Sequence, residues 1–371
     1  MDIVRVLVVD DTVVYRRVLS ELLSSVPGIE LVGTASNGRI ALQKIEQLRP
    51  ALVTLDLEMP EMNGLEVLRR LRATSSDVGA IMLSAFTTQG AEETIAALSL
   101  GAFDFVLKPS TGDMQSSVKA LRSELIPKIQ AFARAAAVRQ RLRKPAAAAS
   151  HPANRAPASG DVIQRMRRVA SGSACKPEVV AIGISTGGPS ALSKMLPGLP
   201  PDLAAPVVIV QHMPPKFTKS LADDLNNRCG LAVSEAVNGQ TVQAGSILIA
   251  PGGHQMKVER IDGALVARVT DDPPENNCKP SVDYLFRSVA YTCGPNSLGV
   301  VMTGMGNDGT LGCRLLKRNG AAIITQDEAT CVIYGMPKMP AEEGLSDVIA
   351  PLDKIAAEIT RFAGKGALAC R

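Results

Sequence analysis

Short apolar runs separated by amphipathic stretches fill the first 125 residues of the chain. The apolar runs have the length and β-branched content of buried strands and cover residues 4–9, 30–35, 52–55, 80–84 and 105–107. Helical patterns lie between them, at residues 15–24, 38–47, 64–73 and 91–100. Because strands that alternate with helices form parallel sheets covered on both faces, residues 1–125 are predicted to be one α/β domain.

The composition changes in residues 126–178, which are rich in Ala, Arg and Pro and poor in large apolar side chains. Such a segment buries too little surface to fold as a core, so we interpret it as a linker whose first part extends the preceding helix. It carries a net charge of +9, against −4 for residues 1–125 and −1 for residues 179–371. A solvated spacer without a specific partner is the simplest interpretation of this charge.

The alternation of strand and helix returns after residue 178. Five further apolar runs, VVAIGIS, PVVIVQH, SILIAPGG, SLGVVMTG and AAIITQD, predict a second α/β domain over residues 179–371. The predicted fold class is therefore α/β, with two doubly wound parallel-sheet domains joined by a linker. A chain of 371 residues is long enough for two such cores.

Composition excludes several classes of function. Aromatic residues make up 3% of the chain, and both predicted domains are neutral or acidic, so we expect no nucleic-acid partner. No apolar run reaches the roughly 20 residues that a membrane span needs, which predicts a cytoplasmic protein without direct membrane insertion. The seven cysteines are scattered without a CxxC pair, so they are interpreted as buried thiols in a reducing compartment.

Polar residues follow successive strands of the first predicted domain. Asp10 and Asp11 follow the first strand, Asp56 the third, Ser84 the fourth and Lys108 the fifth. In a parallel sheet these positions meet at one edge, and three carboxylates together favour a hard cation such as Mg²⁺. Asp56, on the central strand, is then the natural acceptor of a covalent phosphoryl group, with the lysine and the hydroxyl facing its oxygens. Taken singly, each aspartate is also explained as a helix N-cap or a turn residue without a role in binding.

With VVDD at 8–11, LDLEMPEMNGLE at 55–66, LSAF at 83–86 and FDFVLKPS at 103–110, this domain resembles a response-regulator receiver. The resemblance implies a flavodoxin-like fold and Mg²⁺-dependent phosphotransfer to Asp56 from a histidine kinase. It also implies that Ser84, Phe105 and Lys108 respond to phosphorylation.

Ser185 stands in GISTG, residues 183–187, between a predicted strand and a predicted helix. The spacing fits the G-x-S-x-G elbow that exposes a serine nucleophile, but a phosphate-cradling loop or a plain tight connection has a similar composition. The helix expected to begin near Pro189 would direct its free N–H groups at the group that Ser185 attacks, as an oxyanion hole requires.

A serine nucleophile needs a base, and the chain has three histidines. His151 lies in the linker, and His254 follows a Pro-Gly-Gly turn and is expected in a hairpin or an exposed loop. His212 directly follows an apolar strand, at the sheet edge where Ser185 is expected. A single histidine is more often structural, but this position makes His212 the better candidate for the base.

The third member of a triad would be Asp308, in GMGNDG at residues 304–309. The same letters fit the dinucleotide pattern G-x-G-x-x-G, and Asp327 follows Gly304 at about the spacing of a ribose-binding acid. A dinucleotide site is therefore an alternative, although a carboxylate inside the loop would repel a pyrophosphate. Beside an imidazole that becomes positive during catalysis, the same carboxylate is favourable.

The segments GISTGGP, QHMPP, APGGH, KPSVDYLFRS and TGMGNDG resemble the Rossmann-like catalytic domain of CheB-type chemotaxis methylesterases. The resemblance implies a Ser185–His212–Asp308 triad, with Thr186 and Met305 at the active-site loop and oxyanion positions.

It further implies hydrolysis of glutamate γ-methyl esters, and deamidation of glutamines, on the cytoplasmic helices of chemoreceptors. A chemotaxis histidine kinase would be the phosphodonor, and the esterase itself would need no cofactor. A receiver-linked oxidoreductase and a non-catalytic scaffold are the alternatives from other classes.

Overall fold

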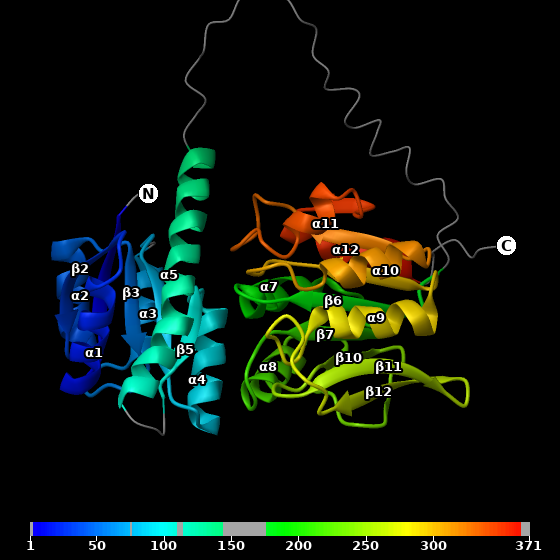
Figure 1. The fold of residues 1–371 in the computed structure, drawn as a ribbon, viewed down its shortest axis with the longest axis horizontal. Helices are drawn as coiled ribbons and strands as arrows, with labels where there is room; N and C mark the ends of the chain where they lie inside the picture. Colours follow the sequence, from blue (N-terminus) through cyan, green and yellow to red (C-terminus); the bar gives the residue numbers. More distant parts are fainter. Residues whose placement is uncertain (1–2, 75, 110–113, 144–175, 365–371) are drawn as a thin grey trace, which may run out of the picture. The chain divides into compact units, whose positions relative to one another are not determined.

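The computed structural model describes residues 3–74, 76–109, 114–143 and 176–364. They divide into two compact units, Met1–Ala136 and Ala137–Arg371, whose elements are coloured in chain order in Figure 1. His151 and most of the predicted linker lie outside the described residues.

The first unit is built on one five-stranded parallel sheet. Its strands are β1 (Val4–Val9), β2 (Ile29–Ala35), β3 (Leu52–Asp56), β4 (Gly79–Ser84) and β5 (Asp104–Leu107). They lie in the order β2-β1-β3-β4-β5, which is the flavodoxin-like order. All five predicted strands are present, each with its ends within one residue of the prediction.

Four helices connect these strands: α1 (Val13–Ser24), α2 (Gly38–Leu48), α3 (Gly64–Ala73) and α4 (Thr88–Ser99). Helix α3 begins where predicted because Asn63 and Glu66 form a capping box at its start. Helix α4 begins three residues before the prediction because the side chain of Thr87 accepts the Gly90 N–H and caps the helix there.

The last helix of this unit, α5 (Met114–Arg143), runs well past residue 125, where the receiver-like domain was predicted to end. Leu121, Leu125, Ile129 and Phe132 are buried at the spacing of one helix face. The Phe132 ring packs edge to face on Phe103, with centroids 5.2 Å apart. The core of the first unit therefore continues to residue 132, within the segment predicted to be the linker.

The second unit contains a seven-stranded parallel sheet in the order β15-β14-β13-β6-β7-β10-β8. The strands are β6 (Val179–Ile184), β7 (Val207–Gln211), β8 (Ala232–Glu235), β10 (Ser246–Ile249), β13 (Ser297–Val301), β14 (Ala322–Gln326) and β15 (Val348–Ala350). The first strand of this sheet in the sequence is β6, near its middle. The next strands extend the sheet from β6 through β7 to β8, and the last three extend it on the other side of β6, from β13 to β15. The carboxyl end of β6 is therefore the topological switch point at which such sheets place their sites.

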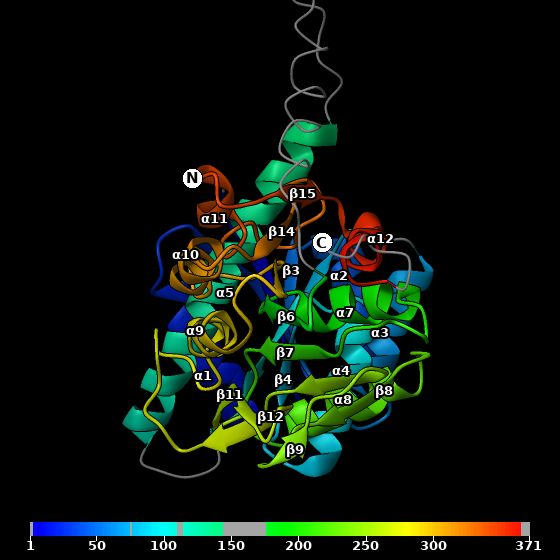
Figure 2. The same cartoon turned by 90° about the vertical axis from the view of Figure 1, so that its right-hand side faces the viewer.

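Helices cover both faces of this sheet, as a doubly wound fold requires. Figure 2 shows α9 (Val282–Cys293) and α10 (Thr310–Arg318) on one face and α7 (Gly188–Met195) and α12 (Leu352–Ala363) on the other. The other helices among residues 176–364 are η1 (Leu196–Gly198), α8 (Phe217–Asn226) and α11 (Lys338–Glu342). The two-domain α/β prediction is confirmed.

A small antiparallel sheet that the sequence analysis did not anticipate packs against α9. It consists of β11 (Gln255–Ile261), β12 (Ala264–Thr270) and β9 (Gln240–Thr241), in the order β11-β12-β9. Asp262 and Gly263, both at positive φ, form the two-residue turn between β11 and β12. None of the helices in the described segments has the length and hydropathy needed to cross a membrane.

Candidate functional site

Three neighbouring strands of the second unit bring the predicted catalytic residues to one sheet edge. Ile184, at the end of β6, pairs with Gln211, at the end of β7, and the next residues in the chain are Ser185 and His212. The His212 amide donates to the Ile184 carbonyl, which continues the strand pairing by one residue. On the other side of β6, the Ser185 amide donates to Thr303, after β13. Ser185 therefore lies between His212 and the loop that carries Asp308.

Two glycines let the backbone close around Ser185. A Cβ on Gly188 would lie 1.8 Å from the Oε1 of Gln211, whose amide nitrogen donates to the Ser185 carbonyl. A Cβ on Gly304 would lie 2.8 Å from that of Ser185 and 2.3 Å from the sulfur of Met336. These contacts give a physical reason for the glycines in GISTGGP and TGMGNDG: each position has room for backbone alone.

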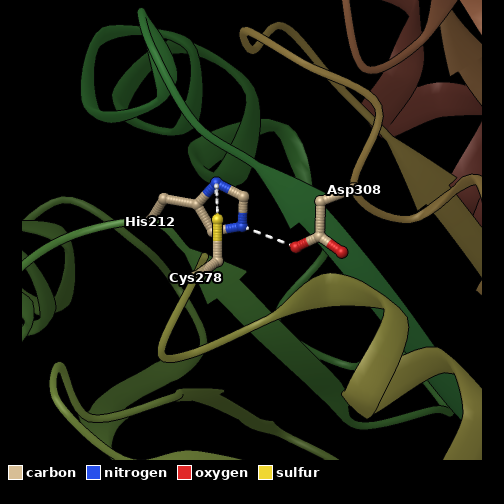
Figure 3. A group of neighbouring side chains, drawn as sticks. All are labelled: His212, Cys278 and Asp308. Carbon is tan, nitrogen blue, oxygen red and sulfur yellow. Dashed lines mark hydrogen bonds and ion pairs between the residues drawn. The ribbon is translucent and has the colours of Figure 1, made fainter. Parts of the chain in front are cut away.

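His212 and Asp308 form a direct pair, shown in Figure 3. The Nε2 atom of His212 lies 2.8 Å from Oδ2 of Asp308, and both side chains are largely buried. Burial alone would lower the pKa of His212, but its contacts with Asp308 and Cys278 outweigh burial and raise the pKa to about 9. The imidazole is thus held in an environment that stabilises its protonated form.

Asp308 is surrounded by hydrogen-bond donors. Besides His212, the donors are the side chains of Asn276 and Ser281 and the backbone N–H groups of Val282, Asp283 and Gly309. Burial would raise the pKa of this carboxyl, but His212 and the backbone donors lower it to about 2. Asp308 therefore stays ionised and fixed in position, as an aspartate that orients a catalytic histidine must be.

The other ring nitrogen of His212 faces a residue that the sequence analysis did not single out. The Cys278 sulfur lies 3.7 Å from Nδ1 (Figure 3). Among the described contacts none joins the Ser185 hydroxyl directly to His212. The prediction that the cysteines are buried thiols is confirmed for Cys293 and Cys313 and is wrong for Cys229, Cys278 and Cys331, which are partly exposed. Cys278 reaches the sheet edge because a tight turn before α9 brings it there.

Ligand atoms of His212, Cys278 and Asp308 lie within 4.8 Å of one another, which raises the question of a metal site. Asp308 and Cys278 contact different nitrogens of one ring, and both contacts are those of a hydrogen-bonded imidazole. The donor set fits a hydrogen-bonded triad better than a metal centre.

Thr186 and Met305 lie on the two loops that flank Ser185. The Thr186 carbonyl accepts a hydrogen bond from the Thr303 hydroxyl, and Met305 follows Gly304, whose N–H and C=O both bond to the segment 333–336. The backbone on both sides of the serine is therefore pinned in place. The Met305 side chain itself is 43% exposed.

The structure disfavours the dinucleotide alternative. Asp308 is 3% exposed and its carboxylate accepts hydrogen bonds from protein donors, so this residue is engaged within the protein and does not face a ligand on the 304–309 loop. Asp327 accepts the N–H of Thr330 in a local turn, where it is held like a structural aspartate. His254 pairs with the exposed Asp271, and none of the described contacts links it to Ser185, so His212 remains the better candidate for the base.

The acidic residues of the first unit converge as predicted. Ligand atoms of Asp10, Asp11 and Asp56 lie within 4.8 Å of one another. Lys108 Nζ lies 2.6 Å from Asp56 Oδ2 and 2.9 Å from Asp10 Oδ2. Burial, helped by the charges of Asp10 and Asp11, raises the pKa of Asp56 to about 6 despite Lys108. The pocket thus holds more negative charge than one lysine compensates.

This pocket fits a small divalent cation. Oδ2 of Asp10 is buried and accepts no hydrogen bond, because Lys108 approaches it without hydrogen-bond geometry. Three carboxylates with a free acceptor match the oxygen ligands of Mg²⁺. An open hollow of about 350 Å³ beside Asp11 leaves room for the waters that Mg²⁺ keeps.

Ser84 and Phe105, the predicted switch residues, are both buried. The Ser84 hydroxyl donates to the Gly90 carbonyl and accepts from Thr94, so it is engaged with α4. The Phe105 ring lies under the ammonium of Lys128, 5.1 Å from the ring centroid. Both side chains therefore occupy defined inward positions from which they would have to move.

Comparison with known proteins identifies the family. The CheB methylesterase family model matches residues 180–359, and the response regulator receiver domain model matches residues 6–121. The protein-glutamate methylesterase/protein-glutamine glutaminase of Desulfotalea psychrophila is 48% identical and covers 96% of this chain and 97% of its own. That of Trichodesmium erythraeum is 43% identical and covers 97% and 99%.

Among solved structures, the CheB methylesterase catalytic domain of Thermotoga maritima is 40% identical to this chain. It aligns over 49% of this chain and 97% of its own, with a TM-score of 0.49. Because relatives of more than 40% identity match almost the full length, the chain belongs to the protein-glutamate methylesterase/protein-glutamine glutaminase family.

Proposed function

We propose that this enzyme hydrolyses glutamate γ-methyl esters on the cytoplasmic helices of chemoreceptors, with Ser185, His212 and Asp308 as its triad and with phosphorylation of Asp56 as its control. The observation that carries the triad is the 2.8 Å contact between His212 and the fully hydrogen-bonded Asp308, one strand away from Ser185.

In the first half of the reaction, Ser185 Oγ attacks the ester carbonyl and transfers its proton to His212. Because Asp308 occupies Nε2, the nitrogen that takes the proton is Nδ1. Asp308 stabilises the imidazolium, and backbone N–H groups near Thr186 and Met305 hold the oxyanion. His212 then protonates the departing methoxide, which leaves as methanol.

In the second half, His212 removes a proton from water, which attacks the acyl-serine and releases glutamate. A glutamine side chain forms the same acyl-enzyme with ammonia as the leaving group, which accounts for deamidation by the same residues. A fluorophosphonate probe tests the nucleophile: labelling of Ser185 supports an esterase, whereas an unlabelled Ser185 favours a non-catalytic scaffold.

The raised pKa of His212 predicts an alkaline pH profile. Nδ1 accepts a proton only when the ring is neutral, so kcat/KM for methanol release should rise about tenfold per pH unit below a midpoint near 9 and level off above it. In Cys278→Ser, one of the two contacts that raise the pKa is weakened, so the midpoint should move to lower pH.

The titratable groups that contact His212 directly are Asp308 and Cys278. Asp283 is one step further away, hydrogen-bonded to Asn276. The pH dependence of kcat/KM therefore reports on these neighbours of His212. Cys229→Ser is the matched control, since Cys229 is half-buried elsewhere in the same unit, and its midpoint should equal that of the wild type. A wild-type midpoint near 6.5 would contradict the assigned environment of His212.

In the first unit, Asp56 is proposed to accept the phosphoryl group from a histidine kinase. Asp10, Asp11 and Asp56 would hold Mg²⁺, which neutralises the carboxylates and orients the phosphoryl oxygens when it is bound. Lys108 would turn from Asp10 to a phosphoryl oxygen, and Ser84 would leave its hydrogen bonds with α4 to contact another. Phe105 would then be free to reposition.

Asp56→Asn should abolish labelling by acetyl phosphate, and chelation of Mg²⁺ should abolish labelling of the wild type. The amide removes the attacking oxygen while preserving the size of the side chain, so folding should be retained, which circular dichroism checks. Asp104→Asn is the matched control, since this aspartate begins β5 and should leave labelling intact. Full labelling of Asp56→Asn at another residue would reassign the acceptor.

A further inference from the structure

Cys278 is held beside the catalytic histidine by a tight hairpin turn. The backbones of Glu275 and Cys278 exchange two hydrogen bonds, and Asn276 and Asn277 between them both have positive φ. This is the geometry of a type I′ turn. Its first residue is anchored to α9 by a bidentate ion pair between Glu275 and Arg287, with distances of 2.7 and 2.8 Å.

The turn is also tied to the triad. The Asn276 side-chain amide donates to Asp308 at 2.9 Å and to Asp283 at 2.8 Å. The Cys278 thiol donates to the Asn276 carbonyl at 3.4 Å and lies 3.7 Å from Nδ1 of His212. Cys278, His212 and Asp308 thus form a continuous chain of contacts (Figure 3), with the sulfur in the place of a nucleophile.

The other cysteines in the described segments lack such a neighbour. Burial raises the pKa of the Cys229 and Cys293 thiols to about 11, and it also raises the pKa of Cys313 and Cys331. Because the thiolate is the reactive form, these four cysteines are poor nucleophiles near neutral pH. Of the five cysteines in the described segments, Cys278 alone is both partly exposed and beside an imidazole.

We propose that Cys278 is a peroxide-sensitive modification site whose oxidation reversibly stops the esterase. The proposal rests on the proposed function, because Nδ1 of His212 is the nitrogen that Ser185 needs. The Cys278 thiolate attacks one oxygen of hydrogen peroxide, so that an S–O bond forms as the O–O bond breaks. The leaving hydroxide takes a proton from His212 and departs as water. Sulfur is oxidised by two electrons to a sulfenic acid, and the peroxide is reduced.

Oxidation blocks catalysis for a geometric reason. The sulfenic oxygen adds an atom between Cys278 and Nδ1, and its hydroxyl hydrogen-bonds to the lone pair that must accept the Ser185 proton. A dithiol reductant removes that oxygen as water and restores the thiol while the reductant becomes a disulfide. The inhibition is therefore expected to be reversible by dithiothreitol.

The experiment treats the full-length protein with hydrogen peroxide and follows two readouts. Mass spectrometry of the dimedone-trapped Cys278 peptide measures oxidation at this residue, and methanol release from methylated receptor membranes measures activity. We expect Cys278 to be oxidised faster than the other four cysteines of the described segments and methanol release to fall in parallel by at least about tenfold, with recovery in dithiothreitol. In His212→Gln, oxidation of Cys278 should slow.

Variants isolate the sulfur. Cys278→Ala should keep its own untreated rate after peroxide treatment, and Cys278→Ser should behave alike if one of the two folds poorly. Cys229→Ala should remain as sensitive as the wild type. Equal loss of activity in Cys278→Ala, or loss that dithiothreitol does not reverse, would overturn the proposal and point to oxidation of an exposed methionine such as Met305.

The two readouts separate this proposal from the proposed function. If untreated protein releases no methanol while Cys278 is still oxidised in a His212-dependent way, the esterase assignment fails and the thiol chemistry stands. If the esterase is active and Cys278 is oxidised no faster than Cys229, the thiol proposal fails alone.

Discussion

Replacing Ser185 with alanine should lower methanol release from methylated receptor membranes by at least about 10⁴-fold. The variant removes the only proposed nucleophile but leaves the strand pairing, Asp308 and its donors in place. Phosphorylation of Asp56 by acetyl phosphate should be unchanged, because Asp56 lies in the other unit. Single-turnover methanol release measures the first effect and phosphoprotein labelling the second.

Ser190→Ala is the matched control, since this serine lies in α7, five residues further on, and should retain the wild-type rate. The neighbouring sulfur supplies the sharpest contrary outcome. If Ser185→Ala keeps more than a tenth of the wild-type methanol release and Cys278→Ala releases none, Cys278 is the nucleophile. His212 and Asp308 would then activate its thiol.

Asp308→Asn should cost about 10⁴-fold in methanol release for a different reason. An amide nitrogen at Oδ2 would face two hydrogen-bond donors, the Val282 N–H at 2.7 Å and the Nε2–H of His212 at 2.8 Å. The ring would satisfy the amide by accepting at Nε2, which moves its proton to Nδ1 and blocks transfer from Ser185. The unpaired Val282 N–H should also cost about 1–3 kcal/mol of stability.

Asp327→Asn is the control for this variant, because Asp327 also follows a strand of the same sheet but its carboxylate bonds to Thr330 in a local turn. Its rate and melting temperature should change little. If Asp308→Asn keeps a near-normal rate and only its melting temperature falls, the carboxylate stabilises the fold and does not orient His212 for catalysis.

The sequence predicted the two sheets well because buried parallel strands are continuous apolar runs. It allowed a hairpin near His254 but did not predict the strands β11 and β12, although Asp262–Gly263 is a strong two-residue turn signal. Strand β11 alternates apolar residues with polar ones such as Lys257 and Glu259. Because it contains no continuous apolar run, the pattern used to predict the buried strands does not identify it. Strand β15, only three residues long, was too short to give a pattern.

The predicted site residues Ser185, His212 and Asp308 could be located because each follows a strand of one parallel sheet. The partners of Asp308 and the neighbour of Nδ1 could not, since Asn276 and Cys278 come from a loop whose contacts depend on the turn before α9. The pairing of Asp308 with Nε2 rather than Nδ1 likewise depends on ring orientation, which no sequence pattern encodes.

The pairing of Ile184 with Gln211 also has a consequence for protein engineering. The proposed nucleophile and base each stand one residue past the last paired position of adjacent parallel strands, and the base works through Nδ1, the ring nitrogen nearer its own backbone. Their spacing is thus set by two main chains and a short side chain rather than by a long reach. A designer could transplant the pair to another parallel α/β sheet by matching these two strand ends, and inserting one residue after either strand should uncouple it.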